Sequence, residues 1–388
     1  MGEDDDALDY HRRNPAKIRV EGAVDVETQD DLSKAYTPGV AAPSRAIADD
    51  PVTVYDYTAK GEMAAVLSNG SAVLGLGDIG ATASIPVMEG KSLLIREFGD
   101  VSAFPLVVDE DDPEELIATA ERLEPMFGFL MLEDIRSPDC FRIEDELSDR
   151  LGIPVFHDDQ HGAAIAILAG LLNALDVVGK EMDSIEVAVV GAGAAGTAAA
   201  DILLEAGAET IHLVDRQGIL APDMDGLNDR QQELAERVNS GGTRGDLADA
   251  VDGADVLLGL ATGGIVSQEM VRSMADDPIV FAMANPDPEI PYHDAKEAGA
   301  AVVGTGRADY PNQINNSLAF PGIVKGALRC NALEINMAMK VAAAEAIADI
   351  VDDPAPDRVV PSSLEDGIAD AVAAAVTEKG RETGACRI

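Results

Sequence analysis

The segment IEVAVVGAGAAG, at residues 185–196, has the pattern of an apolar strand, a glycine-rich turn and the start of a helix. Gly191, Gly193 and Gly196 have the GxGxxG spacing, and Asp215 ends the next strand-like segment, 24 residues after Gly191. In such a unit the first glycine makes the tight turn, the second admits a pyrophosphate, and the third lets the helix pack on the strand. The sequence therefore predicts a dinucleotide site at a helix N-terminus, which favours phosphate charge.

The end of the second strand leaves the identity of the nucleotide open. Asp215 is suited to accept a hydrogen bond from the ribose 2′-hydroxyl of NAD, whereas the adjacent Arg216 is suited to the 2′-phosphate of NADP. Both NAD and NADP therefore remain candidate cofactors.

Two acidic pairs lie upstream of the glycine turn, each directly after an apolar segment. Glu133 and Asp134 end GFLMLEDI, and Asp158 and Asp159 follow IPVFH. If both segments are parallel strands, the pairs lie at their carboxyl ends, where open α/β sheets bind ligands. Clustered carboxylates with few other ligand types suit a hard divalent cation such as Mg²⁺ or Mn²⁺.

Strand-like and helix-like segments alternate along most of the chain, which predicts an α/β protein. The segment at 110–128 has an acidic start and helical spacing, and a long apolar helix is expected at 163–178. From residue 185 the pattern becomes a doubly wound, mostly parallel sheet of the Rossmann type, with a loop after TIHLVD. Ala-rich helices are expected around 332–352 and 364–378. The expected domains are 1–160, an N-terminal α/β unit that carries the acid pairs, and 161–388, the nucleotide domain with a C-terminal helical extension.

The charge balance excludes several classes of partner. The chain has 71 acidic and 28 basic residues among 388, a net charge of −43. Such a surface repels nucleic acid and anionic lipid. Only nine of the basic residues are Lys and aromatic residues make up 4%, a profile typical of proteins adapted to molar salt. There the Debye length falls to about 3 Å, so self-repulsion is screened.

The three cysteines do not form a recognisable framework. Cys140, Cys330 and Cys386 are an odd number without CxxC spacing, so we expect no disulfide framework and a reducing, cytoplasmic compartment. The N-terminus has no basic region followed by an apolar run, and no segment approaches 18 uninterrupted apolar residues. No membrane association is expected.

Two further glycine motifs are incomplete. LGLGDIG repeats the GxGxxG spacing, but no acid ends a following strand and no long helix is expected behind it, so it is predicted to be a loop; its glycines are Gly75, Gly77 and Gly80. The GKS at 90–92 resembles the end of a phosphate-binding P-loop. Position 85 is Ile where that motif needs Gly, so this interpretation fails.

The histidines raise a third possibility, a zinc hydrolase. His157 and His161 are four residues apart, as zinc ligands on a helix can be. The glutamate of HExxH is absent and His157 lies at a predicted strand end, so histidines that face solvent or support the acid pairs are the preferred interpretation. A zinc hydrolase would require stoichiometric zinc and no nicotinamide binding.

Many motifs in fixed order resemble the malic enzymes of the short prokaryotic type, over roughly residues 8–350. They are AYTPGVA, YTAKGE, LSNGSAVLGLGDIG, PVMEGK, LEDI, IPVFHDDQHG, GAGAAG, ANPDPE and TGRADYPNQINNSLAFPG. The resemblance implies oxidative decarboxylation of L-malate to pyruvate and CO₂ with NAD or NADP and Mg²⁺ or Mn²⁺. It also implies a homodimer, in which one subunit lends residues to the other.

The resemblance also implies residue roles. Tyr36 is similar to the general acid of the family, Lys91 to its general base, and Asp158 to the acid that orients the lysine. The implied metal ligands are Glu133, Asp134 and Asp159, and the implied malate contacts near the nicotinamide are Asn285 and Asn316. The large animal-type enzymes have an arginine for the substrate carboxylate where this chain has Ala72. Carboxylate binding is therefore assigned to Asn69, Gly70 and Ser71.

Two other functions compete with this one. The first is a metal-dependent decarboxylating dehydrogenase of another β-hydroxy acid. The second is a catalytically silent nucleotide-binding regulator that keeps the fold. The chain has all three carboxylates implied as metal ligands, together with Lys91 as the implied base and Tyr36 as the implied acid. A regulator has no need to keep them together, which argues against that function.

Overall fold

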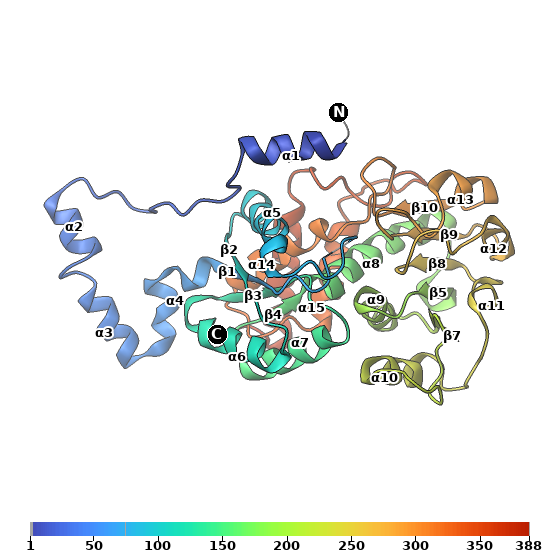
Figure 1. Ribbon diagram of the computed structural model, residues 1–388, viewed down its shortest axis with the longest axis horizontal. Coiled ribbons are helices and arrows are strands. Elements are labelled where there is room, and N and C mark those ends of the chain that lie inside the picture. The colour runs from blue at the N-terminus through green and yellow to red at the C-terminus, as the bar shows by residue number, and fades with distance from the viewer. Residues whose placement is uncertain (1–2, 74, 388) are drawn as a thin grey trace.

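Two mainly parallel sheets and a set of C-terminal helices form the body of the protein, and an N-terminal arm projects from it (Figure 1). The structure is a computed structural model that describes residues 3–73 and 75–387. Hydrophobic side chains of both sheets and of the C-terminal helices belong to one continuous core. The two sheets are therefore packed together through this shared core.

The first sheet has four parallel strands in the order β2-β1-β3-β4. The strands are β1 Met63–Ser68, β2 Ser102–Val107, β3 Phe129–Leu132 and β4 Val155–His157. The connecting helices are α5 Ala81–Gly99, α6 Pro113–Leu123 and α7 Asp139–Arg150. The expected helix at 110–128 is confirmed as α6, which Asp112 caps and Pro113 starts. Because Leu132 of β3 pairs with His157 of β4, the two acid pairs that follow these residues lie side by side at the same edge of the sheet.

The second sheet has six strands in the order β10-β9-β8-β5-β6-β7, of which only β7 is antiparallel among the described residues. The strands are β5 Glu186–Val190, β6 Thr210–Asp215, β7 Gly218–Ile219, β8 Val256–Gly259, β9 Ile279–Ala282 and β10 Val302–Thr305. The helices are α9 Ala194–Glu205, α10 Asp229–Val238, α11 Leu247–Val251, α12 Gln268–Ser273 and α13 Tyr292–Ala298. The strand order reverses between β5 and β8, which places the glycine turn at the topological switch point. The predicted doubly wound fold is confirmed.

A long central helix, α8 Asp158–Val178, leads from the first sheet to the second. By length and composition α8 passes for a membrane-crossing helix, but 67% of its apolar window is buried inside the protein, so it is a core helix. It packs on α9 and on α15 Met337–Ala348. The other C-terminal helices are α14 Phe320–Arg329, which packs on α5, and α16 Ile368–Thr383, which packs on α14 and α15. The division expected at residue 160 falls in the first turn of α8 and stays a prediction.

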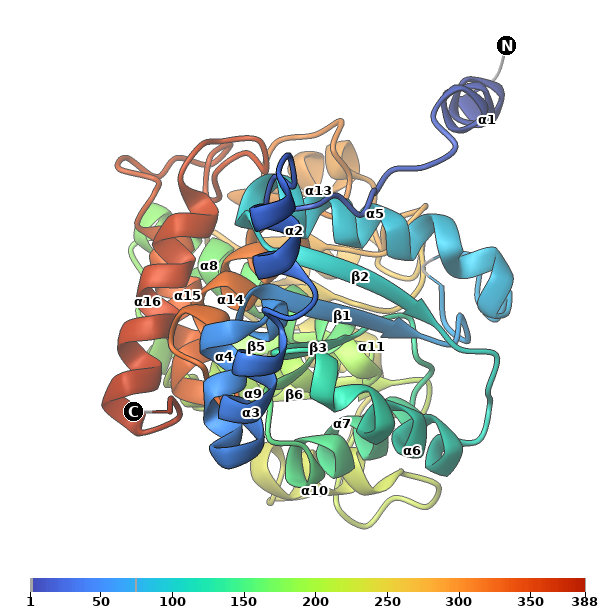
Figure 2. The same cartoon turned by 90° about the vertical axis from the view of Figure 1, so that its left-hand side faces the viewer.

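Much of the N-terminal arm lies away from the body of its own chain, which it contacts where Lys17 Nζ donates to Pro86 O and where Arg387 donates to the Tyr55 hydroxyl. It consists of α1 Glu3–Arg13, α2 Gln29–Ala35, α3 Ala41–Asp49 and α4 Val54–Tyr57. None of the residues of α2, α3 and α4, all of them described, is buried. Figure 1 shows α2 and α3 at the far left, away from the sheets, and in Figure 2 they lie towards the viewer. Apolar side chains exposed along the arm include Val20, Val24, Leu32, Tyr36 and Val40.

Short 3₁₀ turns complete the element order. They are η1 Pro51–Thr53, η2 Ala59–Glu62, η3 Glu124–Met126, η4 Met182–Ser184 and η5 Asn316–Leu318.

Two local expectations were wrong. The segment after TIHLVD is not only a loop, because it contains β7 and α10; Asn228 and Gln231 form the capping box that starts α10. In the LGLGDIG segment, residues 75–80 form a loop, as predicted, and Leu74 lies outside the described residues; however, the long helix α5 follows this loop directly. Lys91 lies in the interior of that helix.

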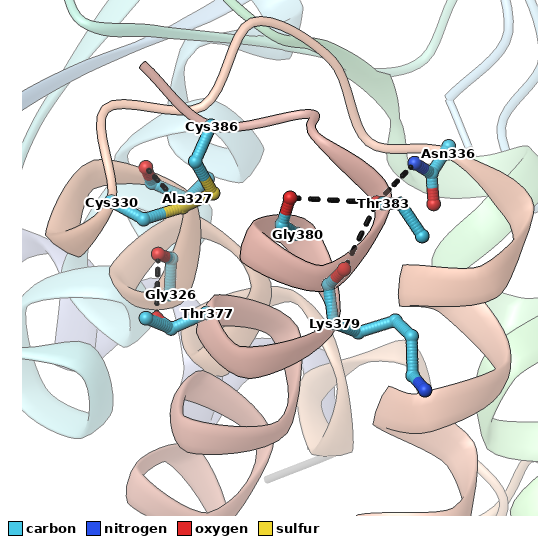
Figure 3. Close-up of a disulfide and its surroundings, with 9 residues drawn as sticks. All are labelled: Gly326, Ala327, Cys330, Asn336, Thr377, Lys379, Gly380, Thr383 and Cys386. Atoms are coloured by element: carbon cyan, nitrogen blue, oxygen red, sulfur yellow. Dashed lines mark hydrogen bonds between the residues drawn. A yellow bond between two sulfur atoms is a disulfide. The ribbon is translucent and has the colours of Figure 1, made fainter. Parts of the chain in front are cut away.

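The expectation of no disulfide was also wrong for one pair. Cys330, at the end of α14, is bonded to Cys386 in the tail after α16, with the two Cα atoms 5.5 Å apart (Figure 3). The bond ties the C-terminal tail to α14, and Cys140 remains free and buried. The two cysteines are 56 residues apart in the chain, so only the packing of α14 against α16 brings them together.

Candidate active site

Three carboxylates gather where β3 and β4 end. Glu133 and Asp134 follow β3, Asp159 lies in the first turn of α8, and one carboxylate oxygen of each is within 4.8 Å of the others. The backbone N–H of Asp134 donates to Asp159 Oδ2 at 2.8 Å, which joins the two strand ends. Glu133 is 3% exposed, and its Oε2 has no hydrogen-bond partner among the described residues. A buried carboxylate oxygen in that state costs free energy that a bound cation offsets, so the cluster fits Mg²⁺ or Mn²⁺.

A buried lysine lies against this cluster. Lys91, 8% exposed, has its Nζ 2.5 Å from Asp158 Oδ2 and 2.8 Å from Glu133 Oε1. The same Nζ lies 4.4 Å from the centre of the Phe320 ring. Burial lowers the pKa of Lys91, but Asp158 and Glu133 outweigh it, so the pKa is raised and the amine is protonated in this structure.

Asp158 connects the lysine to a second candidate residue. It is fully buried as the first residue of α8, and its Oδ2 also accepts a hydrogen bond from Asn316 Nδ2 at 2.6 Å. Gly162 makes this arrangement possible, because an added Cβ would lie 2.0 Å from Asp158 Oδ1 and 3.0 Å from Asn316 Cβ. Lys91, Asp158 and Asn316, distant in sequence, thus lie together at the metal cluster.

The glycine turn has the geometry that the GxGxxG spacing predicts. Gly191 has φ +112°, and an added Cβ would lie 2.4 Å from Leu260 O. A Cβ at Gly196 would lie 1.7 Å from Gly191 O, so only glycine lets α9 approach β5. A Cβ at Gly193 would meet nothing within 4 Å in the described chain, which leaves space for a pyrophosphate.

Asp215 is braced against the glycine turn by a residue that sequence reasoning missed. Gln231 Nε2 donates to Asp215 Oδ2 at 3.1 Å and to Ala192 O at 3.0 Å. Asp215 Oδ1 accepts from the backbone N–H of Arg216, whose side chain is exposed. The capping-box pattern around Asn228 and the helical spacing of Leu234 and Val238 were the signals that could have identified α10.

Asn285 lies in the loop that follows β9, which hydrogen bonds to the buried Glu289 connect to the loop after β8. Its Nδ2 approaches Met283 O at 3.5 Å. Glu289, fully buried, accepts from the backbone N–H groups of Ala261 at 2.8 Å and of Ala284 at 3.1 Å. It thereby joins the loops after β8 and β9. Glu289 belongs to the ANPDPE motif, but its role was not predicted.

The three residues assigned to carboxylate binding mainly hold their own loop together. Asn69 Oδ1 accepts from Ser71 Oγ at 2.7 Å, and Asn69 Nδ2 donates to Glu110 O at 3.0 Å. Gly70 has φ +70°, and its carbonyl accepts from the backbone N–H of Gly80. Ser71 Oγ also accepts from Arg136 N at 3.0 Å. Their side-chain groups are therefore engaged within the protein.

Tyr36 is not brought to Lys91 by its own chain. It caps the C-terminus of α2 on the projecting arm and is 66% exposed. The AYTPGVA segment forms the turn between α2 and α3, at the far left of Figure 1.

The two histidines lie beneath the carboxylate cluster, in contact with a buried glutamate. His161 Nε2 is 3.0 Å from Glu144 Oε2, and His157 is fully buried. Burial alone would raise the pKa of Glu144, but His161 and Lys340 lower it to about 2. Neither histidine belongs to the candidate metal cluster found among the described residues, which consists of carboxylates. Both rings are largely buried, so the solvent-facing interpretation is wrong, and the ring nitrogens of His157 have no hydrogen-bond partner among the described residues.

Two domain models of one protein family match the chain. Residues 15–148 match the malic enzyme N-terminal domain, and residues 160–380 match the malic enzyme NAD binding domain. This chain belongs to the malic enzyme family. The resemblance in the sequence motifs is therefore confirmed, and so is the α/β fold with a Rossmann-like second sheet.

Named malic enzymes are similar over nearly the whole chain. The bifunctional malic/malolactic enzyme of Bacillus subtilis is 49% identical over 387 residues, 99% of this chain and 94% of that protein. The NAD-dependent malic enzyme of Geobacillus stearothermophilus is 50% identical over 96% of this chain and 78% of its own length. A malic enzyme from Rhizobium meliloti, 46% identical over 98% of this chain, is named NADP-dependent.

Solved malic enzyme structures superpose closely on this one. The malic enzyme of Pyrococcus horikoshii has a TM-score of 0.95 and 45% identity, and the match covers 99% of this chain and 92% of that one. The NAD-dependent malic enzyme of Thermotoga maritima has a TM-score of 0.92 and 44% identity, with 96% and 98% covered.

Proposed function

We propose that this malic enzyme converts L-malate to pyruvate and CO₂ while it reduces NAD⁺ or NADP⁺, with Mg²⁺ or Mn²⁺. One observation carries the proposal: the buried Lys91 touches the three-carboxylate cluster at the end of the first sheet, in a chain that also has a dinucleotide turn. Base, cation site and hydride acceptor are the three parts that oxidation of a hydroxy acid followed by loss of CO₂ requires.

Glu133, Asp134 and Asp159 would hold the divalent cation. When bound there, the cation supplies Lewis acidity to the oxygens of the substrate and positive charge that offsets the carboxylates around Lys91. Three carboxylates leave coordination positions for substrate and water.

Lys91 would remove the C2 hydroxyl proton of malate, and a bound nicotinamide would supply the acceptor for the C2 hydride. The amine must be neutral to accept this proton. In the structure Asp158 and Glu133 raise the pKa of Lys91, and the charge of a bound cation would oppose that effect. Asp158 holds the Lys91 Nζ in place, and Asn316 holds Asp158 through its amide. Asn285 and Asn316 would contact malate near the nicotinamide. After CO₂ leaves, the resulting enolpyruvate needs a proton at C3.

Tyr36 would supply that proton, and a second copy of the chain would bring it to the site. The arm that carries Tyr36 has no buried residue in α2, α3 or α4, all within the described chain, and it exposes apolar side chains. An exposed apolar segment of this kind marks a protein–protein interface. We infer a homodimer in which the arm of each subunit covers the site of the other.

The assignment of Asn69, Gly70 and Ser71 to substrate carboxylate binding stays a prediction. The side chains of Asn69 and Ser71 are engaged within the loop, and the backbone N–H groups of Gly70 and Ser71 donate to Ser68 Oγ and Asn69 Oδ1. The strong acid excess points to work in a salt-rich cytoplasm, where the repulsion is screened.

A substrate panel tests the proposal against another β-hydroxy acid. Rates of nucleotide reduction would be compared for L-malate and for malates with alkyl or hydroxyl substituents at C3. The proposal expects the highest kcat/KM for L-malate. A higher kcat/KM for a 3-substituted malate would assign the enzyme to the competing decarboxylating dehydrogenases.

We further propose that NAD⁺ is the preferred nucleotide, because Gln231 holds the Asp215 carboxylate at the end of β6 while Arg216 points to solvent. Replacement of Asp215 by Ala is expected to raise the KM for NAD⁺ by about 10- to 100-fold, since a hydrogen bond to a charged group contributes about 1.5–3 kcal/mol. Initial rates with both nucleotides provide the measurement. The matched control, Arg216→Ala, should leave the KM for NAD⁺ nearly unchanged. A wild-type preference for NADP⁺ that Arg216→Ala removes would reverse the assignment.

A further inference from the structure

A buried glutamate outside the cluster holds the start of α8, the helix that presents Asp158 and Asp159. Glu144 Oε1 accepts from the backbone N–H of His157 at 2.9 Å, and Oε2 accepts from Gln160 Nε2 at 2.8 Å. The ring of His161 completes the contact at 3.0 Å from Oε2. The three partners flank Asp158 and Asp159 on both sides in the chain.

This clamp compensates for the lack of a local cap. The N-cap residue of α8, His157, makes no side-chain cap hydrogen bond in the described structure. N-terminal helix turns otherwise leave backbone donors unsatisfied and fray readily. In α8 the first turn is held from a different element, by a carboxylate that is 8% exposed.

Helix α7 provides a rigid base for the clamp. Cys140, Ile143 and Leu147, on the same helix as Glu144, are buried in the core cluster that includes β3 and β4 residues. The positive charge of Lys340, in α15, lowers the pKa of Glu144 and so stabilises its carboxylate. The carboxylate therefore has a fixed position relative to the sheet from which Glu133 and Asp134 emerge.

We propose that Glu144 is a positioning residue that sets the cation affinity of the site by fixing Asp159 relative to Glu133 and Asp134. The inference rests on the proposed function, because it assumes that these carboxylates hold the metal. Through the same turn Glu144 keeps Asp158 against Lys91. It touches neither substrate nor cation itself.

The test is Mn²⁺ binding, measured as free Mn²⁺ by electron paramagnetic resonance during titration of the full-length protein without substrate. Replacement of Glu144 by Ala should raise the Kd for Mn²⁺ by about 10- to 100-fold, the usual effect of removing a group that supports metal ligands. Glu144→Gln should have a smaller effect, because the amide keeps one acceptor for His157 N and Gln160 can reverse its own amide. If Glu144→Ala fails to fold, Glu144→Gln carries the test.

Glu146 offers a matched control on the same helix. It lies two residues further, pairs with Arg142 and Arg150, and does not contact α8 in the described structure. Glu146→Gln should change the Kd by no more than about twofold, as expected for a surface ion pair. In kinetics, Glu144→Ala should raise the apparent KM for Mn²⁺ and leave the KM for the nucleotide unchanged.

Two outcomes would overturn the inference. One is a Glu144→Ala or Glu144→Gln protein that melts earlier than wild type but binds Mn²⁺ with the wild-type Kd, which would make Glu144 purely structural. The other is an equal loss of Mn²⁺ affinity in Glu146→Gln. Asp159→Asn distinguishes failure of the proposed function, because wild-type Mn²⁺ affinity in that variant would reject the metal site itself and with it the inference.

Discussion

Replacement of Lys91 by Ala is expected to lower kcat for malate oxidation by about 10²- to 10⁴-fold, the usual contribution of a general base. The amine is the only basic group that the described structure places in contact with both Asp158 and Glu133. Initial rates of nucleotide reduction at saturating malate and Mn²⁺ provide the measurement. The variant should still bind Mn²⁺, because Lys91 is not one of the three cation ligands and its positive charge repels the cation.

Chemical rescue separates loss of the base from loss of structure. The deletion leaves a space beside Phe320 and Asp158 in which a small primary amine can replace the missing side chain. Added methylamine should restore part of the rate in Lys91→Ala, with greater rescue at higher pH because the free base is the active form. Lys379→Ala, on the exposed face of α16, is the control and should retain wild-type kcat. Wild-type oxidation by Lys91→Ala would contradict the assigned role.

Mixed dimers are expected to recover activity that neither parent has. Tyr36→Phe should mainly damage decarboxylation and tautomerisation, and Lys91→Ala should block oxidation. If Tyr36 acts on the site of the partner, each mixed dimer contains one site with both native residues. Random exchange of equal amounts should then restore about one quarter of the wild-type rate of pyruvate formation. The measurement is pyruvate produced after the two variants have been denatured and refolded together.

The control for subunit exchange combines two defects on the same side of the site. Lys91→Ala mixed with Asp159→Asn should remain inactive, because Lys91 and Asp159 belong to one cluster of one chain, so every site in the mixed dimer carries a defect. Recovery in this control, or no recovery with Tyr36→Phe, would show that Tyr36 does not act across the dimer.

The sequence predicted those parts of the site that local patterns encode. The glycine turn and the acid pairs directly follow apolar strands, so the sequence showed where these strands end. Residues that follow neighbouring parallel strands were therefore expected to lie together at one edge of the sheet. The order of the motifs indicated the family, and the family resemblance, not the residue pattern, pointed to Lys91 and Tyr36.

Contacts between distant elements could not be predicted in this way. Gln231 reaches Asp215 from a helix in a segment expected to be a loop, and Glu144 reaches α8 from α7. Cys330 and Cys386 meet because α14 packs against α16. Each depends on how helices pack, which hydrophobic spacing in a single sequence does not specify. The exposed position of Tyr36 likewise depends on the arm making few contacts within its own chain.

The most direct test of malic enzyme activity is the initial rate of NAD⁺ and NADP⁺ reduction with L-malate and Mn²⁺ in molar KCl, with pyruvate assayed in parallel. We expect nucleotide reduction that a chelator abolishes and Mn²⁺ restores, with one pyruvate formed for each nucleotide reduced. No turnover with either nucleotide, or reduction that continues without a metal, would contradict it.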